Sequence, residues 1–139
     1  MAIELEWIGG ERFRAVTPEG VELELDGGRT AGLSPTDALL VSLASCMGID
    51  VVDILTKGRQ SLRASRLRVE GERRDSPPRR FTRIRLEVLL IGSGLSRAKA
   101  ERAVELSRTT YCSVWNTLAP DVELDVDLEL REEAGPAPA

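Results

Sequence analysis

Two cysteines, Cys46 and Cys112, are the side chains of this sequence best suited to covalent chemistry. A thiolate is a strong nucleophile and its oxidation is reversible, so two thiols can carry a redox cycle. The chain has no histidine, which excludes a Ser/His/Asp triad, a Cys/His nucleophile pair and any His-ligated metal site. The wide separation of the cysteines also excludes a CxxC zinc or dithiol motif. We therefore expect thiol, carboxylate, hydroxyl and arginine chemistry, with no bound metal.

Cys46 lies in the middle of a mostly apolar segment, residues 34–55, whose second half is acidic. On an ideal α-helix, Asp50 lies about 40° and Asp53 about 20° from the direction of Cys46. Apolar surroundings and nearby carboxylates both favour the protonated thiol. Taken alone, these residues favour a Cys46 that packs as a small hydrophobic side chain, unless a positive charge nearby corrects its chemistry.

Cys112 stands where one predicted helix ends and another begins. Free backbone N–H groups at such a junction can stabilise a thiolate, although a cysteine that simply packs at a helix end is equally ordinary. The residues alone therefore leave the role of this thiol open.

Five segments alternate apolar and polar residues with a period of two, which predicts strands with one buried face. Because the connections between them are short, we expect antiparallel pairing. The segments are IELEW (3–7), VELEL (21–25), RLRVEGE (66–72), IRLEVLL (84–90) and VELDVDLEL (122–130).

Two segments break this alternation and predict helices. The first begins with Ser34 as its N-cap, carries Asp37 three residues later as in a capping box, and ends near residue 57. The second runs over residues 96–111 and restarts over residues 112–118. With a further strand before residue 21, the predicted order is β-β-β-α-β-β-α-β, which is typical of an α+β fold with helices on the apolar face of antiparallel sheet.

The chain of 139 residues fits a single domain, which we place at residues 1–131, before a disordered tail at residues 132–139. The net charge of −4 and pI near 5.0 argue against nucleic-acid and membrane-surface partners. The uncharged apolar run at residues 38–49 is too short to span a bilayer, and no signal peptide is evident. We expect a cytoplasmic protein.

The first helix is apolar on more than one side, which a second subunit would cover.

Three motifs resemble those of the OsmC/Ohr family of organic hydroperoxide reductases. They are S-P-x-[acid]-x-L-L-x-x-L-x-x-C at residues 34–46, Y-C-S-V-x-x-x-L at residues 111–118 and GGERF at residues 9–13. CMGIDVVDIL (46–55) and RFTRI (80–84) are similar to the OsmC-like branch in particular. The resemblance covers nearly the whole chain except the tail.

The resemblance implies an intertwined homodimer whose antiparallel sheets wrap around two central helices. It also implies a thiol peroxidase cycle that needs no bound cofactor. Cys46 would attack the hydroperoxide and become a sulfenic acid, and Cys112 would condense with it to a disulfide. An external dithiol, such as a lipoyl group on a partner protein, would then reduce both cysteines.

In such proteins an arginine near the first strand holds the thiolate, and a glutamate at the start of the first helix orients that arginine. The resemblance places Arg12 at the arginine position, with Arg14 on the same side if the segment is a strand. Thr36 stands at the glutamate position, and Asp37 follows it. Both lie about 14 to 15 Å from Cys46 along a straight helix, so neither can reach its own thiol. We expect a capping role for Asp37, with the aspartates that follow Cys46 as alternative anchors of the arginine.

The apolar surroundings of Cys46 favour an organic or lipid hydroperoxide over hydrogen peroxide. Two other functions stay open on the residues: a non-catalytic module that binds an apolar ligand at the dimer interface, and a redox sensor that forms its disulfide but turns over slowly. The expected pocket walls are Leu39, Leu43, Met47 and Trp115, with Phe13 and Tyr111 as further candidates, although each could equally fill the core.

Overall fold

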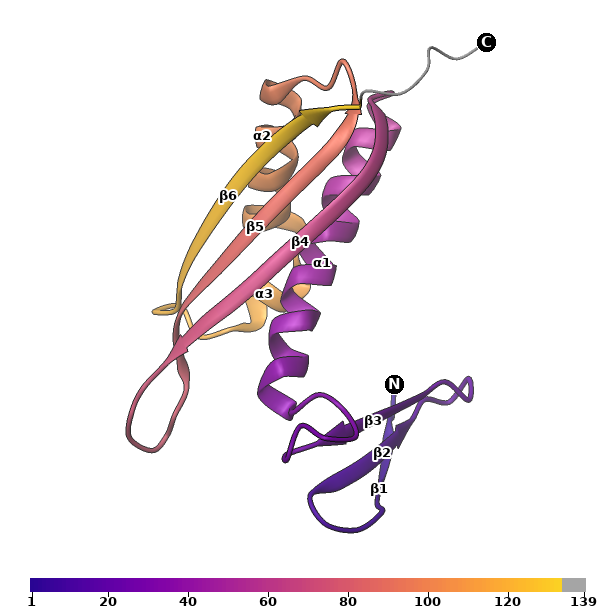
Figure 1. Cartoon of the computed structure of the whole chain (residues 1–139), viewed down its shortest axis with the longest axis vertical. Coiled ribbons are helices and arrows are strands. Elements are labelled where there is room, and N and C mark those ends of the chain that lie inside the picture. Colours follow the sequence, from indigo (N-terminus) through magenta and orange to yellow (C-terminus); the bar gives the residue numbers. More distant parts are fainter. Residues whose placement is uncertain (134–139) are drawn as a thin grey trace. The chain divides into compact units, whose positions relative to one another are not determined.

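The computed structural model describes residues 1–133 of the chain, which form two compact units (Figure 1). The first unit is Met1–Val41 and the second begins at Ser42. The first long helix, α1 (Pro35–Lys57), belongs to both, because the boundary falls within its second turn. The two cysteines therefore lie in the second unit, and both candidate arginines lie in the first.

The first unit contains a three-stranded antiparallel sheet of β1 (Glu4–Trp7), β2 (Arg12–Val16) and β3 (Glu22–Asp26). Its register places Arg14 opposite Glu24, so that one face of the sheet is charged and the other apolar. The strand predicted to carry the arginines is thus confirmed as β2.

The connection from β3 to α1 is held by a buried carboxylate and ends in the predicted capping box. Asp26 accepts hydrogen bonds from the backbone N–H groups of Gly28, Thr30 and Ala31. The N–H bonds of Ala31 and Gly28 lower the pKa of Asp26 to about 2. At the helix start the backbone N–H of Asp37 donates to Ser34 Oγ at 3.1 Å. The backbone N–H of Ser34 donates in return to Asp37 Oδ2 at 3.2 Å.

Helix α1 is buried along one face in the second unit. That face consists of Leu43, Ala44, Met47, Gly48, Val51 and Leu55. Gly48 permits a close approach, because a Cβ atom at this position would lie 3.3 Å from the Leu67 side chain on β4. By length and composition α1 could also cross a membrane, but the core helix of a soluble protein meets the same criterion.

The second unit contains a sheet with the order β4-β5-β6, formed by Ser61–Arg73, Phe81–Ser93 and Glu123–Glu132. Strands β4 and β5 pair in antiparallel fashion, as predicted, whereas β5 and β6 are parallel. The expectation of antiparallel pairing throughout is therefore wrong for this pair. The connection from β5 to β6 is long and helical, and such a crossover returns the chain in the same direction.

That crossover consists of α2 (Arg97–Leu106), a π-helical turn η1 (Ser107–Tyr111) and the short helix α3 (Ser113–Thr117). The helices of this unit lie on one face of the sheet (Figure 1). The predicted order of elements and the α+β class are confirmed, including the restart of the second helix. The periodicity of the sequence did not predict the π-helical turn η1 between α2 and α3.

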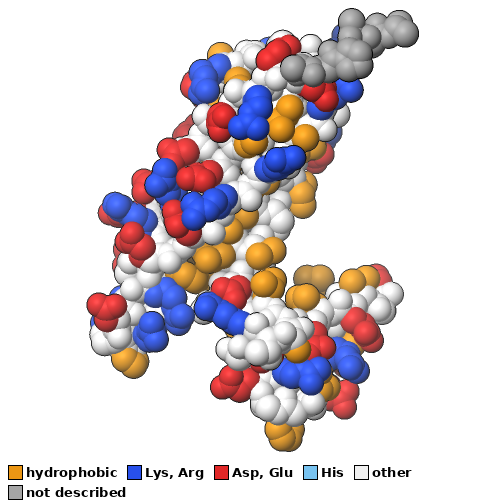
Figure 2. All heavy atoms as spheres, in the orientation of Figure 1, with side chains coloured by type: hydrophobic (Ala, Val, Ile, Leu, Met, Phe, Trp, Pro, Cys, Tyr) orange, Lys and Arg blue, Asp and Glu red, His pale blue; other side chains and the backbone are white. Residues whose placement is uncertain are grey.

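The opposite face of this sheet is charged, with Lys or Arg and Asp or Glu side chains interspersed (Figure 2). Arg83 pairs with Glu123 and Arg85 with Asp127, from β5 to β6. This face is therefore solvated, and the core of the unit lies between the sheet and the helices.

Residues 132 and 133, assigned to the predicted tail, belong to the folded part of the chain. Strand β6 extends to Glu132, and the backbone N–H of Glu133 donates to the carbonyl oxygen of Gly92 at 2.9 Å. Residues 134–139, the rest of the predicted tail, lie outside the described residues.

Candidate functional site

Three reactive side chains converge between α1 and the turn that precedes α3. The sulfur atoms of Cys46 and Cys112 and a carboxylate oxygen of Asp50 all lie within 4.8 Å of one another. Cys46 and Asp50 are four residues apart on α1 and therefore share a face of the helix. Both are half-buried, whereas Cys112 is fully buried. We call these three residues the thiol cluster.

The π-helical turn η1 sets the position of Cys112. The backbone N–H of Cys112 donates to the carbonyl oxygen of Ser107 at 2.8 Å, a bond across five residues that closes this turn. Cys112 itself is extended and is the N-cap of α3, so that the backbone N–H of Trp115 donates to its sulfur at 3.3 Å. Single π-turns inside helices are frequent at functional sites.

Ser107 is a member of the site that the sequence analysis missed. Its side chain is fully buried, and its hydroxyl donates to Asp50 Oδ2 at 2.8 Å. This bond holds the carboxylate beside the two sulfurs. In the sequence, Ser107 is one of the small residues on one face of the predicted helix at residues 96–111. No neighbouring residue indicates a partner on α1.

The surroundings of Cys112 keep it protonated at neutral pH. Burial raises the pKa of the Cys112 thiol to about 11, against the opposing effect of the Trp115 N–H. Cys46 and the negative charge of Asp50 raise it further. Cys46 is the more accessible of the two thiols. The geometry therefore fits Cys46 as the attacking thiol and Cys112 as a thiol that reacts second.

This difference predicts selective alkylation. When the reduced protein is treated with iodoacetamide between pH 7 and 8, we expect Cys46 to be labelled first, with Cys112 at least about 10-fold slower, because only about one thiol in a thousand is ionised three units below its pKa. Cys112 labelling should rise toward pH 11. Mass spectrometry of the two cysteine peptides measures both rates. Equal rates at neutral pH would contradict the assigned order, and the denatured chain serves as the control for intrinsic thiol reactivity.

Arg12 has an acidic partner that the sequence analysis did not identify. Its Nε donates to Glu24 Oε1 on the neighbouring strand at 2.6 Å, and this bond raises the pKa of Arg12. Glu24 thus orients the guanidinium within the first unit. Arg14 is exposed on the same strand. In the described part of the second unit, no arginine forms a hydrogen bond or ion pair with the thiol cluster.

The other candidate carboxylates have separate roles. Asp37 forms the capping box and an ion pair with Arg29, with an Nε to Oδ2 distance of 2.8 Å. The hydrogen bonds from Ser34 and the positive charge of Arg29 lower the pKa of Asp37. Asp53 is exposed and outside the thiol cluster. Of the two aspartates that follow Cys46, the structure therefore brings only Asp50 to the thiols.

Two of the expected pocket walls are core residues. Leu43 and Met47 are 0% and 1% exposed, so they contribute to the core of the second unit. Leu39, in the first unit, and Trp115, beside Cys112, are half-buried.

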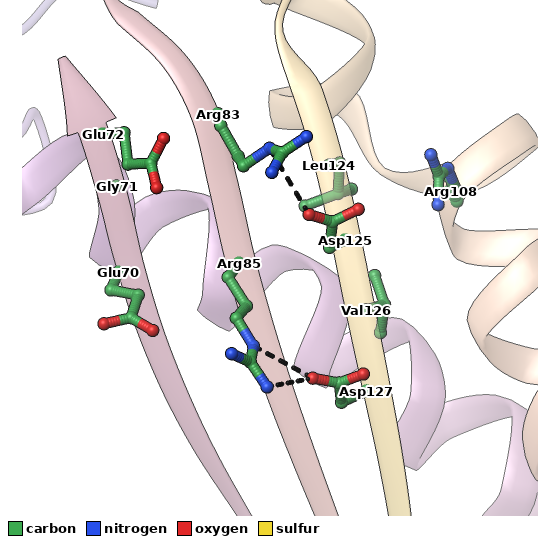
Figure 3. Close-up of a pocket in the computed structure, with 10 residues that line it drawn as sticks. All are labelled: Glu70, Gly71, Glu72, Arg83, Arg85, Arg108, Leu124, Asp125, Val126 and Asp127. Carbon is green, nitrogen blue, oxygen red and sulfur yellow. Dashed lines mark hydrogen bonds and ion pairs between the residues drawn. The ribbon is translucent and has the colours of Figure 1, made fainter.

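A groove at the charged face of the β4-β5-β6 sheet offers different chemistry (Figure 3). Its lining includes Glu70, Arg83, Arg85, Asp125 and Asp127. The two arginines point toward the aspartates of β6 and pair with them (Figure 3). Because both arginines are paired with carboxylates of β6 and the lining includes no thiol, the thiol cluster is the better candidate site.

Comparison with known proteins identifies a family and several relatives of this chain. The model of the "OsmC-like protein" family matches residues 26–127. Protein YhfA of Escherichia coli is 36% identical over 115 residues, which is 82% of this chain and 86% of YhfA. A hypothetical protein from Aquifex aeolicus has a similar crystal structure, with a TM-score of 0.86, 32% identity and coverage of 95% of this chain and 96% of that one.

The fold also occurs in proteins with a described role. The organic hydroperoxide resistance protein OsmC of Legionella pneumophila aligns with a TM-score of 0.64 over 94% of this chain and 96% of its own. At 20% identity, this likeness shows a shared fold and nothing finer.

Proposed function

Because the chain belongs to the OsmC-like protein family, we propose that it is a thiol-dependent peroxidase that reduces organic hydroperoxides. The family includes hydroperoxide resistance proteins, of which the Legionella OsmC is one. The observation that carries the proposal is the convergence of the two cysteine sulfurs, from α1 and from the turn before α3, at one half-buried site.

The reaction begins with Cys46. Its thiolate attacks one oxygen of the hydroperoxide, the O–O bond breaks, and the alkoxide leaves and takes up a proton to become an alcohol. Cys46 is then a sulfenic acid. Cys112 attacks its sulfur, a disulfide forms, and the sulfenic hydroxyl leaves as water. A dithiol supplies two electrons and two protons to restore both thiols.

A carboxylate near both thiols supports a role for Asp50 in the second step. One of its oxygens lies within 4.8 Å of both sulfurs, and Ser107 donates a hydrogen bond to the carboxylate. As Cys112 attacks, its proton must leave its sulfur and another must reach the departing hydroxyl. We assign Asp50 to carry it between them. The first step would be assisted by a cation, because a positive charge near a thiolate stabilises it.

We assign that cation to Arg12, with Glu24 as its positioning residue. The Arg12–Glu24 pair takes the place of the helix-start glutamate, whose position is occupied here by Thr36. A guanidinium fixed by a carboxylate loses little further freedom when it contacts a thiolate. Arg14, which has the same direction along β2, is the alternative.

A homodimer would complete the site and cover the apolar surface that a single chain leaves exposed. Leu5, Trp7 and Leu23 on the first sheet are 57%, 63% and 54% exposed, and Ile49 on α1 is 62% exposed. Leu5, Trp7 and Leu23 share one face of their sheet, and exposed apolar side chains that lie together are typical of an interaction site. In the proposed dimer it is covered by a second copy.

The remaining assignments follow from the chemistry of the site. Two free thiols suit a reducing compartment, so we place the protein in the cytoplasm. The apolar side chains around the proposed interface favour a hydroperoxide with a hydrocarbon tail. The reductant is a small dithiol or a lipoyl group on another protein, which must be narrow enough to approach a disulfide whose second sulfur is buried.

The test is peroxide consumption by the purified protein. With cumene hydroperoxide, a dithiol reductant and a metal chelator present, we expect many turnovers per chain, and faster consumption than with hydrogen peroxide. Without reductant, we expect one turnover and the loss of two hydrogen atoms from the intact mass, which marks the disulfide. Absence of both would overturn the proposal and favour a non-catalytic binding module. Disulfide formation without sustained turnover across reductants would favour a redox sensor.

A further inference from the structure

We propose that the reduced thiol cluster is also a binding site for Zn²⁺, with Cys46, Cys112 and Asp50 as its three protein ligands. From the sequence we expected no bound metal, because the chain has no histidine and no CxxC motif. The ligand set proposed here has neither, and it is assembled from α1 and the turn before α3. Occupation of the site by Zn²⁺ would block the oxidation of both thiols. Metal binding itself does not depend on the proposed peroxidase activity, whereas the blocking effect does.

The types of ligand atom favour Zn²⁺. Two sulfurs and one carboxylate oxygen form a set that Zn²⁺ accepts, and zinc sites with three protein ligands keep a fourth position open for water or another ligand. Cys46 and Asp50 are half-buried within the single chain, in contrast to the fully buried Cys112. A metal bound there could exchange with free Zn²⁺ instead of being a permanent structural centre.

The geometry is close to that of a tetrahedral site. In a tetrahedron with Zn–S bonds of about 2.3 Å, two sulfurs lie about 3.8 Å apart. The three ligand atoms here lie within 4.8 Å of one another. The adjustment required is at most about 1 Å between the sulfurs and at most about 1.3 Å between a sulfur and the carboxylate oxygen, which rotation of the half-buried Cys46 and Asp50 side chains can supply.

The neighbours of the cluster support metal ligation. Ser107 donates to Asp50 Oδ2 and so fixes the carboxylate, in the manner of partners that orient metal ligands. A carboxylate has about four lone-pair sites, so this bond leaves capacity for a metal. The backbone N–H of Trp115 donates to the sulfur of Cys112, a contact that stabilises the thiolate form.

Zn²⁺ binding requires the reduced protein, and the only other change on binding is the release of protons. Each thiol releases one proton to solvent as its sulfur binds the metal, and no atom is oxidised or reduced. Both sulfurs are then coordinated to the cation and are poor nucleophiles toward a hydroperoxide. In the disulfide form the same sulfurs are joined to each other, so the site no longer exists.

The experiment is a titration of the reduced, chelator-treated protein with Zn²⁺ under anaerobic conditions, in competition with a chromophoric zinc chelator. We expect one Zn²⁺ per chain. Cys46→Ser should weaken binding by at least about 100-fold and Asp50→Asn by at least about 10-fold, since loss of a supporting partner alone costs about 10- to 100-fold. Asp53→Asn is the matched control, because it removes the same charge from the same helix outside the cluster, and it should bind as the unaltered chain does.

A second readout needs no variant. Cd²⁺ added to the unaltered reduced protein should produce the ultraviolet absorption of cadmium–thiolate bonds, with an intensity for two sulfurs per metal, and the disulfide form should produce none. The proposal is overturned if the disulfide form binds Zn²⁺ equally well, or if Asp50→Asn binds as tightly as Asp53→Asn. Peroxide consumption measured with chelator present stays independent of these results, so a failure of either proposal is distinguishable from a failure of the other.

Discussion

Replacing Cys46 by serine is expected to abolish hydroperoxide consumption, whereas replacing Cys112 by serine is expected to leave a single turnover. A serine hydroxyl is almost fully protonated at neutral pH, and loss of a nucleophile typically costs at least about 10⁴-fold in rate. In Cys112→Ser the first step is intact, but the sulfenic acid on Cys46 has no thiol partner in the chain. It should therefore persist and react with a sulfenic-acid probe.

The measurement combines stopped-flow consumption of cumene hydroperoxide with the intact mass of the protein after reaction. Cys112→Ser should gain one oxygen atom, and the unaltered chain should instead lose two hydrogens. Ser113→Ala is the matched control, because it changes an exposed side chain next to Cys112 and should leave both results unchanged. If Cys112→Ser removes the first turnover and Cys46→Ser retains it, the two roles are reversed.

Replacing Arg12 by alanine is expected to slow the oxidation of Cys46 by about 100-fold at neutral pH. An opposite charge within a few ångströms changes the population of an ionised group by about 10- to 1,000-fold. Without Arg12, a carboxylate oxygen of Asp50 still lies within 4.8 Å of the Cys46 sulfur, and no assigned positive charge remains to offset it. Alkylation of Cys46 at pH 7 should therefore also slow in this variant, while the buried Cys112 stays as unreactive as in the unaltered chain, which a loss of structure would not produce.

Arg14→Ala is the control for this prediction, since it removes the same charge two residues away on the same face of β2. It should react at nearly the rate of the unaltered chain. Glu24→Gln should fall between the two, because the guanidinium remains but loses the carboxylate that orients it. If Arg14→Ala is the slower variant, Arg14 is the residue that holds the thiolate. If neither variant differs from the unaltered chain, no guanidinium assists Cys46 and the proposed first step is wrong.

The helix that carries Cys46 could be predicted from the sequence because its signals are local. Ser34 and Asp37 lie within one turn, and the capping box they form depends on no distant residue. The strands were predicted for the same reason, since alternation with a period of two is a property of consecutive residues. The parallel pairing of β5 with β6 was not predicted, because it depends on the length and course of the crossover between them.

The sequence by itself determined which chemistry is available: two thiols, several carboxylates and arginines, and no histidine. It also determined that Cys46 and Asp50 share a helix face, because that relation is fixed by helical periodicity. Only the tertiary structure decided that Cys112 and the hydroxyl of Ser107 meet that face. Ser107 and Asp50 are 57 residues apart, and such a contact arises from the packing of the π-helical turn against α1. The pairing of Arg12 with Glu24 likewise depends on the register of β2 and β3. Residue types and local patterns supply the reactive groups, but the distances between them are set by how the elements pack.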